Sequence, residues 1–408
     1  MRLSDRPVRT IVGAVADAAA RWTDGDFPPR VRALERVCKR TRYSEPVVEY
    51  AFDRLFESLE RAELEKTVAR ELGDLDALDR FVSRGDGRRE RALPAGRVCV
   101  VSSRTTVGVA IVPAVFALLA KCDVLVKDRE DALVSTFFKT LAEDLEDFRV
   151  SAIAETWNGE RDARDLGSFD VVVAFGDDAT LATIARDLDW RTKLVGYGTK
   201  ASAGYVARES LATPYGAERL AAAAARDHVL YETEGCMSLH ALFVETGGAV
   251  DPKTFADLLA RAVRQAAIEF PPSTRDAVTI ARVAAARDAA VFRAAQGAAT
   301  VHSDADATFV VEYAEKNAGA PEFLPRTLRV IAVDGPQDAL EYLARHGIPI
   351  EAMAVDGERD DVIAMAISAG ASRIARFGAL QAPFAGGRHG GRPRIAEFVR
   401  WVGDESSI

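Results

Sequence analysis

The stretch RVCVVSSRTTVGVAIVPAVFALLAKCDVLVK, residues 97–127, decides the fold class. It begins with Arg97–Val101, a short run rich in β-branched side chains that predicts a buried strand. Residues 107–120 form an apolar run of the length of a buried helix. Residues 123–126 repeat the strand pattern and end at Lys127. A buried strand, a helix and a second buried strand in succession are typical of a parallel sheet covered on both faces.

The same alternation continues along the chain. It predicts further helices over residues 132–147, 179–188, 217–227, 253–269, 336–346 and 360–369. It predicts further strands over residues 150–156, 169–175, 193–197, 238–245, 308–313, 326–333 and 350–355. We therefore expect an α/β protein, with a Rossmann-type dinucleotide-binding domain over residues 91–198 and an α/β catalytic domain over residues 199–380.

The two ends of the chain have a different character. Residues 1–90 carry apolar side chains at helical spacing and predict a helical N-terminal region. Residues 85–96 form a polar, Gly- and Arg-rich segment that predicts a connection. Residues 381–408 predict a Gly-rich tail followed by an apolar helix over residues 395–402, which we expect to contribute to a homo-oligomer.

Composition excludes several classes of protein. A length of 408 residues indicates more than one domain, and 48% hydrophobic residues are enough to fill the cores. The net charge of -9 gives no support for a nucleic-acid partner. No apolar stretch reaches the ~20 residues of a membrane span, and MRLSDRPVRT at the N-terminus lacks a signal core. Four dispersed cysteines argue against a metal site or disulfide framework, so we expect a reducing, cytoplasmic location.

Cys236 is the candidate nucleophile. It lies in YETEGCMSLH, residues 231–240, between a predicted helix and a predicted strand. Gly235 before it allows close approach of a substrate. The alternative is an inert thiol, which is the interpretation that fits Cys38, Cys99 and Cys122. His240 would share a strand face with Cys236 and could lower the pKa of its thiol, although a packed histidine is the favoured interpretation.

The segment around Cys236 resembles the nucleophile loop of the aldehyde dehydrogenase superfamily. DVLVKDRE (residues 123–130), FDVVVAFGDDAT (169–180) and LVGYGTK (194–200) resemble other segments of that superfamily, in the same order. Within it, the chain resembles the bacterial fatty acyl-CoA reductases that make aldehyde for bioluminescence. This second resemblance is carried by SRIARFG (372–378), QAP (381–383), HGGRP (389–393) and FVRWV (398–402). Together the matching segments cover roughly residues 95–402.

The resemblance implies a nicotinamide cofactor and the residues that bind it. The implied cofactor-binding residues are Ser102, Ser103, Arg104, Lys127, Glu130, Gly176, Asp177, Gly198 and Glu322. Lys127 would contact the adenosine ribose or a 2′-phosphate, the alternative being a surface lysine. Arg129 favours NADP and Glu130 favours NAD, so the choice is open from the residues alone, and the resemblance favours NADPH. Asp177 and Asp178 are also candidates for a helix N-cap, a role that we assign to Asp178.

The chain departs from the superfamily at two positions. The usual oxyanion-binding Asn is missing, and Arg104 lies near its place, so the second donor is open between Arg104, Thr105 and a backbone N–H. The backbone N–H of Cys236 is the first candidate donor. Gly196 stands where aldehyde-oxidising members carry a water-activating Glu. Glu232 and Glu234 are either replacements for this base or solvent-facing loop acids.

These features predict a reductase that converts an acyl thioester to an aldehyde through a thioester on Cys236, with NADPH or NADH. The resemblance implies that the substrate is a fatty acyl-CoA or an acyl-carrier thioester. Two alternatives stay open: a reductase of an acyl phosphate, of the glutamyl phosphate type, and a catalytically degenerate scaffold. His389 would line the substrate mouth or serve as a turn residue.

Overall fold

The computed structural model describes residues 2–85, 88–103, 106–128, 132–156, 166–297, 299–357 and 359–406. Two predicted site residues, Arg104 and Glu130, lie outside the described residues, as do Thr105 and Arg129. The chain forms two compact units. The first unit comprises Met1–Thr41, Val48–Thr199 and Phe384–Ile408, and the second comprises Arg42–Val47 and Lys200–Pro383.

The N-terminal region is helical, as predicted. Its helices are α1 (Val8–Trp22), α2 (Pro28–Thr41), α3 (Glu45–Glu57) and α4 (Arg61–Leu72). The buried indole of Trp22 at the end of α1 packs against the ring of Phe56, with centroids 4.7 Å apart. Its Nε1–H donates to the Thr140 hydroxyl oxygen at 3.1 Å. This aromatic cluster joins the N-terminal helices to the helices of the neighbouring sheet.

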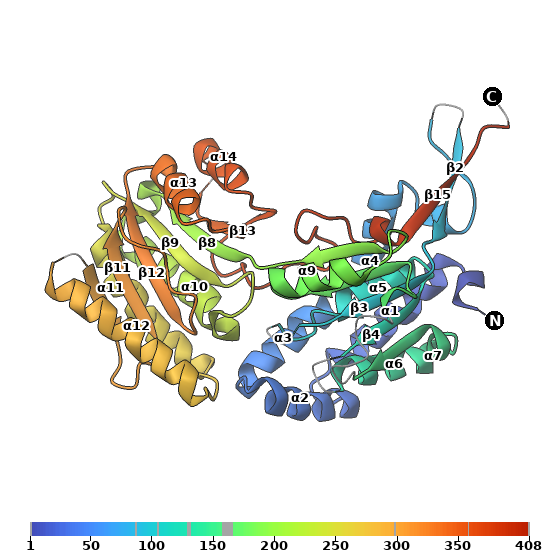
Figure 1. Ribbon diagram of the computed structural model, residues 1–408, viewed down its shortest axis with the longest axis horizontal. Coiled ribbons are helices and arrows are strands. Elements are labelled where there is room, and N and C mark those ends of the chain that lie inside the picture. The colour runs from blue at the N-terminus through green and yellow to red at the C-terminus, as the bar shows by residue number, and fades with distance from the viewer. Residues whose placement is uncertain are drawn as a thin grey trace. The chain divides into compact units, whose positions relative to one another are not determined.

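A parallel sheet of five strands forms the centre of the first unit, in the order β5-β4-β3-β6-β7. Its strands are β3 (Arg97–Val101), β4 (Asp123–Lys127), β5 (Ala152–Glu155), β6 (Val171–Phe175) and β7 (Lys193–Tyr197). Its helices are α5 (Ile111–Leu119), α6 (Leu133–Asp144), α7 (Phe148–Ser151) and α9 (Asp178–Asp187). Helix α9 covers one face, while α6 and α7 lie on the other (Figure 1). The predicted dinucleotide-binding topology is confirmed.

The C-terminal prediction of a helix over residues 395–402 is wrong. Only a short 3₁₀ turn, Ala396–Phe398, precedes strand β15 (Val399–Asp404). β15 pairs antiparallel with β2 (Arg89–Pro94), which itself pairs with β1 (Val82–Ser83) (Figure 1). The prediction of a connection without regular structure over residues 85–96 is also wrong, because this segment contains β2. The backbone partners that make each segment a strand are far away in the sequence, and Val399, Trp401 and Val402 are residue types that favour strands.

The second unit is built on a sheet of seven strands in the order β10-β11-β12-β9-β8-β13-β14. All neighbouring pairs are parallel except β10 and β11. The strands are β8 (Ala201–Val206), β9 (Leu239–Glu245), β10 (Ala299–Ser303), β11 (Val310–Glu315), β12 (Thr327–Val333), β13 (Ile350–Val355) and β14 (Arg373–Ala375). The expected α/β alternation is therefore confirmed, although β8, β10 and β14 were not predicted.

Helices cover both faces of this sheet. They are α10 (Pro214–Val229), α11 (Pro252–Glu269), α12 (Ala277–Ala295), α13 (Pro336–Arg345) and α14 (Asp360–Ser368). α13 and α14 lie on one face, and α10, α11 and α12 on the other (Figure 1). The buried rings of Tyr205, Phe243 and Tyr342 belong to the core beneath α13 and α14. In the part of the chain that the structure describes, no helix has the length and hydrophobicity needed to cross a bilayer.

Candidate active site

Most of the predicted cofactor residues that the structure describes lie at one edge of the sheet in the first unit, whereas Glu322 belongs to the second unit. Ser102 follows β3, and Lys127 is the last residue of β4. Gly176 follows β6, and Gly198 lies just beyond β7. Because these strands are parallel neighbours, their carboxyl ends lie side by side, which is where nucleotides bind to sheets of this kind. Lys127 is buried, with 5% of its surface exposed, so the alternative of a surface lysine is wrong.

The turn after β6 begins helix α9. Asp177 is the N-cap, because its carboxylate accepts the N–H of Thr180 at 2.7 Å, and this hydrogen bonding lowers the pKa of Asp177. The assignment of the N-cap to Asp178 is therefore wrong. The Asp178 carboxylate instead accepts the backbone N–H of Thr199 at 2.9 Å. Asp178 thus ties the first turn of α9 to the segment that leaves β7.

Two glycines at this edge have little room for a side chain. A Cβ on Gly198 would lie 2.4 Å from the Oδ1 of Asp178, so the hydrogen bond of Asp178 would have to break. A Cβ on Gly196 would lie 3.2 Å from a methyl of Leu181. Glycine at these positions keeps the backbone of β7 close to α9.

A stack of three rings lies at the carboxyl ends of β6 and β7. The ring of Tyr197 lies 4.8 Å from that of Phe175 and 4.3 Å from that of His389, measured between centroids, and both pairs are stacked. His389 also forms an antiparallel bridge with Arg392, so it is a turn residue, as one of the two interpretations predicted. Its ring reaches from the C-terminal segment to the predicted cofactor edge.

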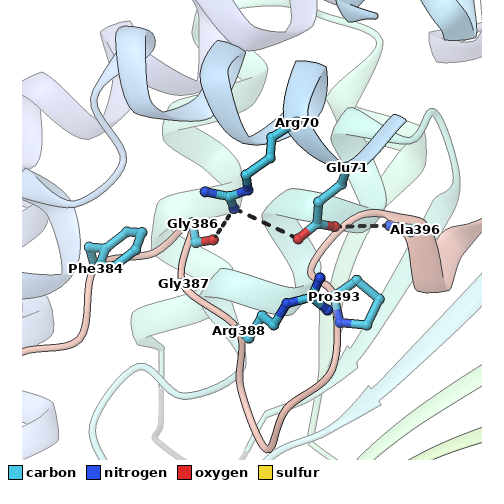
Figure 2. Close-up of a pocket in the computed structure, with 8 residues that line it drawn as sticks. All are labelled: Arg70, Glu71, Phe384, Gly386, Gly387, Arg388, Pro393 and Ala396. Atoms are coloured by element: carbon cyan, nitrogen blue, oxygen red, sulfur yellow. Dashed lines mark hydrogen bonds and ion pairs between the residues drawn. The ribbon is translucent and has the colours of Figure 1, made fainter. Parts of the chain in front are cut away.

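A cavity of about 510 Å³ lies beside this C-terminal segment, lined by residues of α4 and of the Gly-rich loop (Figure 2). The Arg70 guanidinium donates to the carbonyl of Gly386 at 2.5 Å. The Glu71 carboxylate accepts the backbone N–H groups of Arg394 and Ile395 at 2.9 and 2.8 Å. These bonds fasten the loop to α4. The cavity contains none of the predicted site residues, so we assign it no catalytic role.

Cys236 lies in a turn of the second unit, between the short helix η4 (Leu230–Thr233) and β9. Its carbonyl accepts the Ser202 hydroxyl at 2.7 Å, and the carbonyl of Gly235 accepts the N–H of Ser238 at 2.9 Å. The residue is half-buried, as Cys38 is, whereas Cys99 and Cys122 are buried. The structure therefore places the predicted nucleophile in a fixed turn with part of its surface accessible.

The surroundings of Cys236 favour its neutral thiol. Burial, and next the negative charge of Glu351, raise the pKa of Cys236 to about 11. The backbone N–H groups of Cys236 and Met237 act in the opposite direction, as does the ammonium of Lys200. Lys200 and Glu351 form an ion pair at 2.9 Å. Deprotonation of the thiol must therefore accompany the reaction or require a change in this pair of charges.

Glu351 was not predicted as a site residue. It is 2% exposed on β13, next to the edge strand β14, and its carboxylate also accepts the Ser372 hydroxyl at 2.5 Å. A signal was present in the sequence, because IEAMAV, residues 350–355, places one acid in an otherwise apolar strand. Buried carboxylates of this kind are rare unless they are paired or functional.

An unusual backbone precedes Cys236. Tyr231, Glu232 and Thr233 have φ values of 55°, 55° and 62°, in the left-handed region that non-glycine residues seldom occupy. The Glu232 side chain is buried against two guanidinium groups: Arg326 Nε lies 2.7 Å from Oε1, and Arg275 Nη2 lies 3.0 Å from Oε2. The interpretation of Glu232 as a solvent-facing acid is wrong. Both of its oxygens are engaged, so it is poorly suited to act as a base.

Glu234 is the exposed acid of this loop. The Tyr43 hydroxyl lies 3.4 Å from its Oε2. Loss of hydration, and next the charge of Glu232, raise the pKa of Glu234. Of the two acids weighed as substitutes for the missing base, Glu234 is therefore the one with an available carboxylate.

Two histidines near Cys236 are neutral at physiological pH. Burial lowers the pKa of both His228 and His240 to about 4. His240 lies on β9 whereas Cys236 lies in the turn before it, so the premise of a shared strand face is wrong. His240 packs on Phe323, with centroids 5.2 Å apart, which fits the favoured interpretation of a packed residue. Glu322, next to Phe323, is exposed.

Asp227 links the C-terminal signature to the nucleophile loop. Its buried carboxylate accepts the N–H groups of Gly378 and Leu380 at 2.7 and 3.0 Å, and burial raises its pKa to about 7. The Gln381 amide donates to the carbonyl of Asp227 at 3.1 Å and to the Ser238 hydroxyl at 2.8 Å. The conspicuous RFG and QAP segments thus contribute to holding the turn that contains Cys236.

Comparison with solved structures identifies the fold. The chain is similar to a NAD-dependent benzaldehyde dehydrogenase from Corynebacterium glutamicum, with a TM-score of 0.69 and 14% identity over 99% of this chain and 87% of the other. It is also similar to an NADP-bound glyceraldehyde-3-phosphate dehydrogenase from Methanocaldococcus jannaschii, with a TM-score of 0.70 and 10% identity over 98% and 90% of the two chains. An oxidoreductase from Marinobacter aquaeolei gives a TM-score of 0.71 at 13% identity, over 97% of this chain and 85% of the other.

The fold is therefore that of the aldehyde dehydrogenases, as the sequence predicted. A family model described as acyl-CoA reductase (LuxC) matches residues 3–401. The chain belongs to this acyl-CoA reductase family, and the predictions of its superfamily and of an oxidoreductase enzyme are confirmed. No curated protein matches the sequence significantly.

Proposed function

We propose that this protein reduces a fatty acyl-CoA to the aldehyde through a covalent thioester on Cys236. The family supplies the thioester substrate class. The observation that carries the residue assignment is the position of Cys236: a half-buried thiol in a fixed turn, with the N–H groups of Cys236 and Met237 near its sulfur. An acyl phosphate substrate has less support, because the family is one of acyl-CoA reductases.

The first step is acyl transfer to the enzyme. The sulfur of Cys236 forms a bond to the acyl carbon, the bond from that carbon to the carrier sulfur breaks, and the thiol proton ends on the released carrier. Negative charge develops on the acyl oxygen during the attack. Backbone N–H groups at the turn, those of Cys236 and Met237, are suited to stabilise it, in place of the missing asparagine.

The cofactor in this proposal is a reduced nicotinamide nucleotide, with NADPH preferred. The carboxyl edge of the five-stranded sheet fits such a group, since Gly176 and Gly198 keep the backbone bare and Lys127 is buried there. Ser102, Lys127, Gly176 and Gly198 would hold it. When bound, it supplies the hydride that converts the Cys236 thioester to the aldehyde. The relatives bound to NADP support this class of cofactor without fixing the choice.

The direction of the reaction follows from a missing group. Gly196 has no side chain to activate water, and both oxygens of Glu232 are engaged by guanidinium groups. Glu234 keeps an available carboxylate, and the proposal requires that this carboxylate does not activate water at Cys236. The thioester on Cys236 would then resist hydrolysis, and it would be reduced or returned to a thiol acceptor.

We also propose that the protein forms a homo-oligomer through strand β15. β15 is an edge strand of its sheet and displays Trp401, which is 39% exposed. Edge strands readily pair with a second chain. Size-exclusion chromatography with light scattering tests this proposal, and a strictly monomeric protein at micromolar concentration would contradict it.

The experiment for the main proposal measures NADPH oxidation and aldehyde release from acyl-CoAs of varied chain length. Cys236→Ala should abolish both signals. Cys38→Ala is the matched control, because Cys38 is also half-buried and belongs to α2 of the first unit, whereas Cys236 belongs to the second unit. Equal rates in the Cys236→Ala variant and the unaltered protein would contradict the proposal.

A further inference from the structure

A groove of about 170 Å³ between α2 and α6 has three cations on its walls. Arg32 and Arg36 come from α2, and Thr136 and Lys139 come from α6. All four residues belong to the first unit. Within the described residues, Arg32, Arg36 and Lys139 form no ion pair or hydrogen bond, and all three residues are exposed. The chain has a net charge of -9, so this is an unusual concentration of unpaired positive charge.

The charges do not support the helix that carries them. Arg32 and Arg36 are spaced so that they face the same side of α2, and like charges at this spacing disfavour a helix. Two other cations of α2 do not take part in the groove: Arg30 pairs with Asp53 at 2.6 Å, and Lys39 is not among the residues that line the groove. A groove lined by three cations that repel one another is stabilised by a bound anion.

The groove lies beside the first turns of α6. This helix begins at Leu133, shortly after β4 ends at Lys127, so its N-terminus is near the carboxyl edge of the sheet. Thr136 and Lys139 occupy its first two turns, where the helix dipole also favours negative charge. The groove therefore lies at the end of α6 that follows β4, the strand whose last residue, Lys127, is predicted to contact the adenosine ribose.

The size and chemistry of the groove select the ligand group. Pockets for whole small molecules start at about 300 Å³, so this groove suits one charged group of a larger ligand. Two guanidinium groups, an ammonium and a hydroxyl match the oxygens of a phosphate dianion. Both ligands of the proposed reaction, NADPH and acyl-CoA, carry a phosphomonoester on the adenosine ribose.

We infer that the groove formed by Arg32, Arg36, Thr136 and Lys139 binds the ribose phosphomonoester of an adenosine-containing ligand. This inference rests on the proposed function, which names the two ligands that could supply the phosphomonoester: NADPH with its 2′-phosphate and CoA with its 3′-phosphate. The guanidinium groups of Arg32 and Arg36, on α2, bind oxygens of the phosphate. The Thr136 hydroxyl and the Lys139 ammonium, on α6, bind the same phosphate from the other wall of the groove.

The test measures binding without turnover. Adenosine 2′,5′-bisphosphate, adenosine 3′,5′-bisphosphate and adenosine 5′-monophosphate are titrated calorimetrically into the full-length protein at low salt. We expect one bisphosphate to bind at least about tenfold more tightly than the monophosphate, as charge-assisted contacts to phosphate predict. Preference for the 2′-phosphate identifies NADPH as the source, and preference for the 3′-phosphate identifies CoA.

Arg36→Gln/Lys139→Gln should remove this preference and leave binding of the monophosphate unchanged. The matched control is Lys39→Gln/Arg149→Gln, which removes the same charge from exposed positions outside the groove and should keep the preference. Equal binding of all three nucleotides, or a preference that survives in the groove variant, would overturn the inference. Because no catalysis is measured, a protein without reductase activity can pass this test and an active reductase can fail it.

Discussion

Glu232 and Arg326 form a buried ion pair, with Oε1 and Nε 2.7 Å apart, and both residues have left-handed backbones, with φ values of 55° and 49°. The backbone N–H of Arg326 also donates to the carbonyl of Glu232 at 3.3 Å. Each left-handed residue costs on the order of 1–3 kcal/mol, so the pair must hold the backbone in place. It fixes the run of residues that leads to Cys236 against the start of β12.

Arg326→Met should therefore destabilise the second unit and slow the chemistry at Cys236. Removing one partner of a buried ion pair costs about 3–5 kcal/mol, and Arg275 still pairs with Glu232, so we expect about 3 kcal/mol. Urea unfolding measures the stability, and kcat measures the positioning. Arg287→Met, at the more exposed pair with Asp288, should cost less than about 1 kcal/mol. Equal losses in both variants would contradict this role of Arg326.

The reactivity of Cys236 should rise steeply with pH. Its pKa is raised to about 11, so the thiolate fraction, and with it the rate of alkylation by iodoacetamide, should increase about tenfold per pH unit between pH 7 and 10. Peptide mapping of the alkylated protein separates Cys236 from Cys38. A rate that levels off near pH 8 would show that the thiol is far more acidic than its surroundings imply.

Charge substitutions near the thiol should shift this profile in opposite directions. Glu351→Gln removes a negative charge that raises the pKa of Cys236, so alkylation at pH 8 should accelerate several-fold. Lys200→Met removes a positive charge that lowers the same pKa, so alkylation should slow. Shifts of the same sign in both variants would argue against an electrostatic origin.

The contribution of Asp227 to stability should fall as the pH rises from 4 to 7, against the opposite contribution of His228 and His240, whose pKa values are lowered to about 4. The pKa of Asp227 is about 7 in the folded protein, against about 3.9 when unfolded, so folding favours the protonated carboxyl. That contribution is complete below pH 4 and declines by about 1.4 kcal/mol per pH unit until the pH passes 7. Asp227→Asn cannot ionise, so the stability of the unaltered protein relative to this variant should fall over this range, while His228 and His240 act equally in both proteins. An identical pH profile in the variant would refute this assignment.

Gly198→Ala should weaken binding of the nicotinamide nucleotide. Its Cβ would lie 2.4 Å from the Asp178 carboxylate, which must then release the N–H of Thr199 and displace the segment after β7. We expect the KM for NADPH to rise several-fold with a smaller change in kcat. Gly319→Ala is the control, since a Cβ there meets nothing within 4 Å. An unchanged KM in Gly198→Ala would remove this glycine from the cofactor site.

The parallel sheets were predictable because their strands are continuous apolar runs, as in VVVAF of β6. Strand β8 was missed because its sequence, ASAGYV, consists mostly of small residues. Its structure explains that composition: a Cβ on Gly204 would lie 2.6 Å from the Phe377 ring. The strand character of Val399–Asp404 was missed because its pairing with β2 is a long-range contact that local pattern does not contain.

The candidate site also has parts that could be predicted from the sequence and parts that could not. The positions of Cys236, Lys127, Gly176 and Gly198 in the fold were predictable, because each residue follows or ends a recognisable element, while their roles stay predictions. The surroundings of Cys236 were not, because Glu351, Asp227 and Arg326 come from separate strands and helices that only folding brings together. Burial of Glu232 could not be inferred either, since its partner Arg326 is 94 residues away.

The measurement that tests the central claim most directly is mass spectrometry of the protein after exposure to acyl-CoA without cofactor. Intact mass should increase by one acyl group, and fragmentation should locate it on Cys236. Addition of NADPH should then remove the acyl group and release the aldehyde. An adduct on any other residue, or turnover to aldehyde with no dependence on Cys236, would contradict the account.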